Sequence, residues 1–132
     1  MSTSSSSKCR VLVVEDDVSA GRTLAQLLRE DGYDVEVVLD GEAAIARLGV
    51  PPTPDVLVTD YRLPRADGLE VVDFGRKLHP GLGVVMVTSY PEVIARLDQR
   101  PNVPTVIFSK PLVYADLTRA LEGFRAGAVT TT

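Results

Sequence analysis

Cysteine and histidine are nearly absent from the chain, which contains one residue of each, Cys9 and His79. A single cysteine excludes a disulfide within the chain and a cysteine-based zinc site. No hydrophobic run approaches the roughly 20 residues that a membrane-spanning helix needs. The N-terminal stretch "MSTSSSSKCR" also lacks the apolar centre of a signal peptide. These absences favour a protein of the reducing cytoplasm.

An excess of basic charge is also missing, because 14 Lys and Arg stand against 18 Asp and Glu, for a formal net charge of −4. A surface for nucleic acid or for an anionic membrane would need clustered basic residues, so we expect neither as a direct partner. The 132 residues suit one domain, and the 45% that are hydrophobic are enough for a sizeable core. We expect a disordered lead over 1–7, the domain over 8–126 and a short flexible tail over 127–132.

Short apolar runs rich in β-branched residues recur along the chain and predict strands at 10–14, 34–38, 55–59, 83–87 and 105–108. Apolar residues with helical spacing lie between and after these runs, within 20–28, 43–48, 68–78, 91–99 and 117–124. The runs are mostly continuous, as in a parallel sheet covered on both faces, and the more alternating second run suits an edge strand. The pattern predicts an α/β fold, namely a doubly wound, flavodoxin-like (βα)5 unit with a five-stranded parallel sheet in the order 2-1-3-4-5.

Charged and hydroxyl side chains follow the predicted strands at the edge where the carboxyl ends of the strands meet. They are Glu15 and Asp16 after the first strand, Asp60 after the third, Thr88 after the fourth and Lys110 after the fifth. Ligands of such sheets bind beyond this edge, near the first and third strands. Two like charges 4 Å apart repel by about 4 kcal/mol at an effective dielectric near 20, and one lysine cannot neutralise three carboxylates. The carboxyl groups therefore either take up a proton or bind a hard divalent cation, for which Mg²⁺ is the best candidate.

A phosphoryl group at this edge would give the remaining residues a role. Lys110 can pair with one phosphoryl oxygen, and the hydroxyl of Thr88 can donate to another. Asp60 is then the candidate nucleophile, since attack by a carboxylate on phosphorus forms an acyl phosphate. Two further aspartates, Asp17 and Asp67, are better explained as N-caps of the helices that follow them.

The sequence closely resembles the receiver domain of two-component response regulators over about residues 10–125. Four segments carry the resemblance, in order and with family-like spacing: VLVVEDD (11–17), VTDYRLPRADGLE (58–70), VVMVTSY (84–90) and FSKPL (108–112). The resemblance implies that Asp60 accepts a phosphoryl group from a histidine kinase or histidine phosphotransfer protein. Phosphorylation would then switch binding to a downstream protein partner.

The resemblance also implies roles for the other residues at this edge. Mg²⁺ would be bound by Asp16, Asp60 and the backbone carbonyl of Arg62, with Glu15 acting largely through a coordinated water. Thr88 and Lys110 would contact the phosphoryl group, and the peptide bond between Lys110 and Pro111 would be cis.

Three departures from the family pattern are visible, and one is the stretch RPNVPT (100–105), which replaces the Gly-Ala that is common before the fifth strand. Ile107 stands three residues before the lysine, where the family usually has Tyr or Phe, and Phe108 should point to the opposite face of the sheet because side chains alternate along a strand. The acidic pair begins with Glu15 where Asp is commoner.

Other functions compete with the phosphoacceptor. A Mg²⁺-dependent aspartyl-phosphate phosphatase of small substrates usually carries a second aspartate two residues after its nucleophile, but Arg62 occupies that position. A nucleotide-binding module would need a glycine-rich phosphate loop, and none follows any predicted strand. We therefore expect a phosphoacceptor that assists its own phosphorylation and dephosphorylation, and not an enzyme acting on other substrates. Whether the domain stands alone or belongs to a larger protein, and whether it forms a homodimer, are left open.

Overall fold

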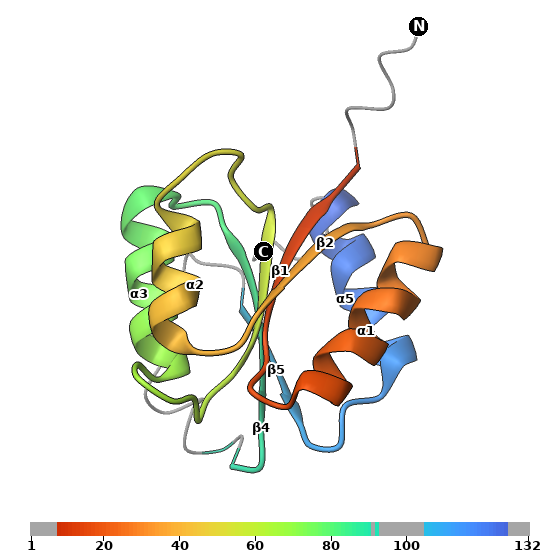
Figure 1. Ribbon diagram of the computed structural model, residues 1–132. Helices are drawn as coiled ribbons and strands as arrows, with labels where there is room; N and C mark the ends of the chain where they lie inside the picture. Colours follow the sequence, from red (N-terminus) through yellow and green to blue (C-terminus); the bar gives the residue numbers. More distant parts are fainter. Residues whose placement is uncertain (1–7, 91, 93–104, 127–132) are drawn as a thin grey trace, which may run out of the picture.

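The computed structural model describes residues 8–90, 92 and 105–126, and its centre is a parallel sheet of five strands (Figure 1). The strands are β1 (Arg10–Val14), β2 (Asp34–Val38), β3 (Val56–Asp60), β4 (Gly83–Thr88) and β5 (Thr105–Ser109). Their order across the sheet is β2-β1-β3-β4-β5, so the predicted topology and the edge position of the second strand are confirmed. The predicted lead over 1–7, the tail over 127–132 and all but Glu92 of the predicted helix over 91–99 lie outside the described residues.

Helices cover both faces of the sheet. The described helices are α1 (Val18–Glu30), α2 (Gly41–Leu48), α3 (Gly68–Leu78) and α5 (Tyr114–Ala126). Figure 1 shows α1 and α5 on one side of the sheet and α2 and α3 on the other. None of these helices has the length and apolar character of a membrane span.

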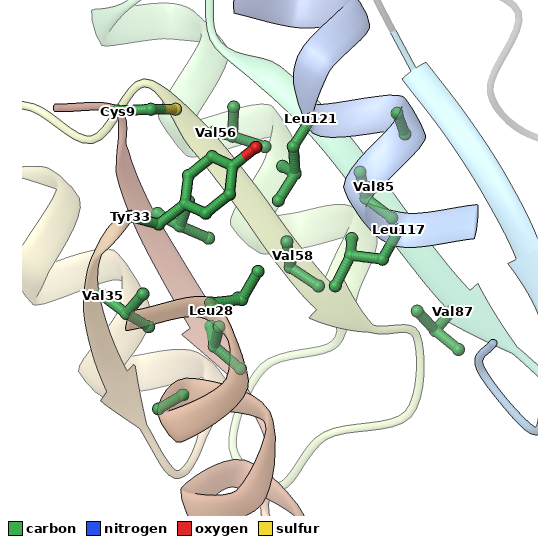
Figure 2. Packing of buried hydrophobic residues seen from close by; sticks show 14 residues of the cluster. Cys9, Leu28, Tyr33, Val35, Val56, Val58, Val85, Val87, Leu117 and Leu121 are labelled. Atoms are coloured by element: carbon green, nitrogen blue, oxygen red, sulfur yellow. The ribbon is translucent and has the colours of Figure 1, made fainter. Parts of the chain in front are cut away.

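The two layers of helices explain why the strands read as nearly continuous apolar runs. In β1, Val11 and Val13 pack in a cluster with Leu28 of α1 and Leu117 of α5, and Figure 2 shows this cluster closely packed. Leu12, which lies between these two valines, points to the opposite face of the sheet and joins a second cluster with residues of α2 and α3. Because side chains alternate between the two faces of a strand, both sets must be apolar when both faces are buried.

Aspartates begin three of the helices. The side chains of Asp17 and Asp67 accept hydrogen bonds from the backbone of Ala20 and Glu70 at 3.0 and 2.9 Å, which confirms both as N-caps. Glu70 also accepts from the backbone of Asp67 at 2.9 Å, completing a capping box that fixes the start of α3. Asp40 caps α2 in the same way, a role that the sequence reading did not assign. These caps place the helix starts next to the carboxyl edge of the sheet.

Candidate functional site

Three carboxylates meet at the carboxyl edge of the sheet. Glu15 and Asp16 follow β1, and Asp60 ends the neighbouring strand β3. One carboxylate oxygen of each lies within 4.8 Å of the others. Asp60 is only 6% exposed, whereas Asp16 is exposed and Glu15 is intermediate. The structure thus brings together the acidic residues that the strand order had placed side by side.

Lys110 completes this cluster from the other side of Asp60. It directly follows β5, and its Nζ lies 2.8 Å from Oδ1 and 3.0 Å from Oδ2 of Asp60. Its backbone N–H donates to the carbonyl of Thr88 at 2.9 Å, which joins it to the end of β4. The peptide bond between Lys110 and Pro111 is cis, as the resemblance implied. The ammonium group is therefore held against both oxygens of one carboxylate.

Burial has the largest effect on the pKa values of the two carboxyl groups Asp60 and Glu15. It raises the pKa of Asp60, and the Lys110 ion pair, which lowers that pKa, does not cancel the effect; Asp16 adds a further rise. Burial likewise raises the pKa of Glu15, with the charge of Asp60 contributing. For Lys110, burial alone lowers the pKa, but its hydrogen bond to Asp60 and the nearby carboxylates reverse this, so its pKa is raised. The site holds more negative charge than its one lysine balances.

A divalent cation fits this donor set. All three side chains offer carboxylate oxygens, which are the ligands that Mg²⁺ prefers. The raised pKa of Asp60 and Glu15 indicates that their charges lack sufficient compensation from the protein. A hard cation among the three carboxylates would supply that compensation.

A divalent cation held by these carboxylates should bind more weakly as the pH is lowered. Burial raises the pKa of Glu15 and Asp60, so these groups take up protons at a higher pH than ordinary carboxyls, and a protonated carboxyl is a poor ligand. We expect the Mg²⁺ dissociation constant to rise as the pH falls from 7.5 to about 5, with protons released on binding. Calorimetry in two buffers of different ionisation enthalpy measures both quantities. Equal affinity at both pH values, with no proton release, would contradict the assignment of these groups as ligands.

Thr88 ends β4 in a buried position, 3% exposed. Its Oγ1 accepts a hydrogen bond from the backbone N–H of Tyr90 at 3.0 Å. A hydroxyl has one proton to donate as well as lone pairs, so this contact leaves the Thr88 proton available to another acceptor. The geometry is compatible with the predicted contact from Thr88 to a phosphoryl oxygen.

Arg62 and Tyr90 form a contact that the sequence reading did not predict. The Arg62 guanidinium carbon lies 5.6 Å from the centre of the Tyr90 ring, a cation–π distance. Arg62 lies two residues beyond Asp60, and Tyr90 lies two residues beyond Thr88. The resemblance implied a role for the backbone carbonyl of Arg62, but no local pattern in the sequence pairs the side chains of Arg62 and Tyr90.

The loop between Asp60 and α3 is held where its two ends meet and again in its middle. Where the ends meet, Gly68 at the start of α3 donates its backbone N–H to the carbonyl of Tyr61 at 2.7 Å, and a Cβ on Gly68 would lie 2.3 Å from the carbonyl oxygen of Asp60. In the middle, Gly41 at the start of α2 donates to the carbonyl of Pro64 at 3.1 Å, and a Cβ on Gly41 would lie 2.0 Å from the carbonyl oxygen of Ala66. Both positions therefore require glycine for close backbone approach.

Ile107 and Phe108 point to opposite faces of the sheet, as predicted from alternation. Ile107 packs against the cluster on the α2 and α3 side, and Phe108 packs against the cluster on the α1 and α5 side. Phe108 therefore does not replace the missing aromatic residue on the face that Ile107 occupies.

Comparison with known proteins agrees with the geometry. Residues 11–122 match the family described as the response regulator receiver domain. Response regulator receiver protein CpdR of Brucella abortus is 30% identical over 113 residues, which cover 86% of this chain and 93% of CpdR. Transcriptional regulatory protein TrcR of Mycobacterium tuberculosis is 32% identical over 117 residues, which cover 89% of this chain and 45% of TrcR.

Solved structures show the same fold. A response regulator receiver protein from Sinorhizobium medicae matches with a TM-score of 0.83 at 23% identity, over 92% of this chain and 98% of that chain. A CheY-like receiver domain protein from Methanospirillum hungatei matches with a TM-score of 0.77 at 26% identity, over 91% and 96% of the two chains. The chain thus spans nearly all of several relatives and less than half of TrcR.

Proposed function

This chain belongs to the family of response regulator receiver domains, and from that premise we propose that Asp60 accepts a phosphoryl group from a histidine kinase or histidine phosphotransfer protein. The observation that carries the proposal is the position of Asp60. Its buried carboxylate lies between the acidic pair Glu15–Asp16 and the ammonium group of Lys110. This arrangement combines a nucleophile with charges that can bind the transferred group.

The proposed step is an in-line transfer to a carboxylate. An oxygen of Asp60 bonds to phosphorus as the bond between phosphorus and the donor nitrogen breaks, which leaves an acyl phosphate on the protein. Lys110, already in contact with both oxygens of Asp60, would move its charge to the incoming phosphoryl oxygens. Thr88 would donate its hydroxyl proton to another of these oxygens.

Mg²⁺ is the proposed cofactor, held by Asp16, Asp60 and the carbonyl of Arg62, with Glu15 acting largely through a coordinated water. When bound, it supplies positive charge that offsets the repulsion between the carboxylates and the phosphoryl group. The exposed Asp16 and the buried Asp60 offer it oxygens from two strand ends. Phosphorylation then adds about −1.5 to −2 charges at Asp60 if it resembles other phosphorylated side chains, enough to bias a local two-state element.

The proposed output is binding to a downstream protein partner, within the cytoplasm where kinases of this type act. DNA binding is not proposed for this chain, although TrcR, of which it spans 45%, is a transcriptional regulatory protein. The described residues show scattered basic side chains, several of them in ion pairs with acidic neighbours, such as Arg47 with Glu36. We therefore propose a protein partner and not a nucleic acid.

Stoichiometry separates a phosphoacceptor from the alternative, a Mg²⁺-dependent phosphatase of small substrates. With acetyl phosphate and Mg²⁺ we expect one phosphoryl group per chain, detected by mass spectrometry of the intact protein, and phosphate release no faster than decay of that adduct. Beryllofluoride with Mg²⁺ should shift the amide NMR signals near the site. Many turnovers per chain on several small phosphoesters would support the phosphatase instead.

A further inference from the structure

A groove begins at the carboxylate cluster and runs between the sheet and α1. It has a volume of about 910 Å³, and its charged end contains Glu15, Asp16, Asp60 and Lys110. Volumes of roughly 300–1,000 Å³ are typical of sites that bury small molecules. The proposed phosphotransfer uses only the charged end, so the rest of the groove has no assigned role.

The body of the groove is apolar. Val13, Val58 and Val87 of three adjacent strands line it, and Figure 2 shows Val58 and Val87 on the face that Leu117 covers. Leu24 and Leu27 of α1 and Leu112 after β5 also line it. Leu27 is 38% exposed, so the groove leaves part of this apolar surface open to solvent.

The groove has two different ends. Along α1, the lining residues extend from Asp17 beside the carboxylates to Leu27, a span of about 15 Å at 1.5 Å per residue. Beyond Leu27, the hydroxyl of Tyr114, which also lines the groove, donates to Asp31 at 2.7 Å and so links α5 to the end of α1. A ligand would thus place a polar head at the charged end and an apolar tail toward this link.

We propose that the groove binds the acyl chain of small acyl phosphates, so that donors with four to six carbons phosphorylate Asp60 better than acetyl phosphate does. This inference rests on the proposed function. The head of such a donor complements Lys110 and a cation held by the carboxylates, and its tail complements the valine and leucine lining.

Phosphoryl transfer from the acyl phosphate to Asp60 needs no further reactant. An oxygen of Asp60 bonds to phosphorus as the bond from phosphorus to the acyl oxygen breaks, and the released carboxylate keeps the electron pair. No proton needs to move, because the leaving group is a stable anion. Each methylene fully buried should raise the rate at low donor concentration by up to about fourfold, from the usual transfer free energy.

The experiment compares acetyl, butyryl and hexanoyl phosphate at equal low concentrations with Mg²⁺, following the phosphorylated protein by mass spectrometry. We expect butyryl phosphate to react at least about threefold faster than acetyl phosphate. Thr23 is an exposed residue of α1 that also lines the groove, so Thr23→Trp should fill the groove and remove the preference, with butyryl and acetyl phosphate then reacting at equal rates. Gln26→Trp, on an exposed part of α1 that does not line the groove, is the matched control and should keep the preference.

A second measurement does not depend on reaction. Hexylphosphonate, compared with methylphosphonate, should shift the methyl NMR signals of Leu24, Leu27 and Leu112 but not that of Leu78, which lies on α3. If Thr23→Trp is poorly folded by circular dichroism, Leu27→Gln replaces it, with the same expected loss of preference.

Two failures are distinguishable. Equal rates for all chain lengths, or a preference that survives in Thr23→Trp or its replacement Leu27→Gln, overturns the inference, leaves the proposed function intact and assigns the groove to another occupant, such as a protein partner. Failure of every acyl phosphate to phosphorylate Asp60 overturns this inference, and the proposed function falls with it only if beryllofluoride with Mg²⁺ also leaves the amide NMR signals near the site unchanged.

Discussion

Replacement of Asp60 by asparagine is expected to abolish phosphorylation by acyl phosphates or by a cognate kinase. Asparagine has nearly the same shape but no nucleophilic carboxylate, so the rate should fall by at least about a thousandfold, to below detection. Stability at pH 7 without Mg²⁺ should not fall with it. Burial raises the pKa of Asp60, so the folded protein holds this proton more tightly than the unfolded chain, and ionisation at neutral pH opposes folding. The Asp60→Asn substitution removes that opposing charge, although it also removes the ion pair with Lys110.

Asp17→Asn is the matched control for this substitution. Asp17 lies beside the carboxylate cluster, but its side chain caps α1 through the backbone N–H of Ala20. Asparagine caps helices as well as aspartate does, so the phosphorylation rate should stay within about twofold of that of the unmodified protein. The free energy of unfolding should not change either. Mass spectrometry of the intact protein and urea unfolding measure the two properties. Substantial phosphorylation of the Asp60→Asn variant, or its loss in Asp17→Asn, would place the phosphoacceptor elsewhere.

The sheet and the carboxylate cluster were predictable from the sequence because each depends on features that are local in the chain. The run ending at Asp60 is apolar on both faces, which indicates a central strand, and the capping signal of Asp67 marks the start of the next helix. Once the strand order is known, every residue that follows a strand falls on the same edge. The strand order alone therefore predicted that Glu15, Asp60 and Lys110 lie at one edge of the sheet, and side-chain conformations were not needed.

The features that sequence reasoning missed depend on contacts between distant parts of the chain. Tyr114 bonds to Asp31 across 83 residues, and the stacking of Arg62 on Tyr90 joins two separate loops. Neither contact has a local pattern, because a tyrosine or an arginine at those positions is equally compatible with solvent exposure. The groove along α1 was hidden for the same reason: its lining residues are ordinary core and surface residues until the packing leaves a space between them.

Gly68→Ala should damage the site although Gly68 carries no functional group. A Cβ at this position would lie 2.3 Å from the carbonyl oxygen of Asp60 and 3.0 Å from the Cα of Tyr61, both backbone atoms that cannot rotate away. Relief of this clash must shift the end of β3 or the start of α3. We expect a loss of about 1–3 kcal/mol in the free energy of unfolding, as for other overpacked sites. The phosphorylation rate should fall by about tenfold to a hundredfold, because a displacement of about 1 Å is enough for such an effect.

Gly81→Ala tests whether this effect comes from the contact between Gly68 and Asp60 or from the replacement of any glycine by alanine. A Cβ at Gly81 would meet no atom within 4 Å, so this variant should keep both its stability and its phosphorylation rate. Alanine also favours helix more than glycine does by about 1 kcal/mol, which would stabilise the first turn of α3 if no clash occurred at Gly68. A Gly68→Ala variant that is as stable and as reactive as Gly81→Ala would therefore show that the end of β3 adapts freely. In that case the close approach of Gly68 to Asp60 would not position the phosphoacceptor.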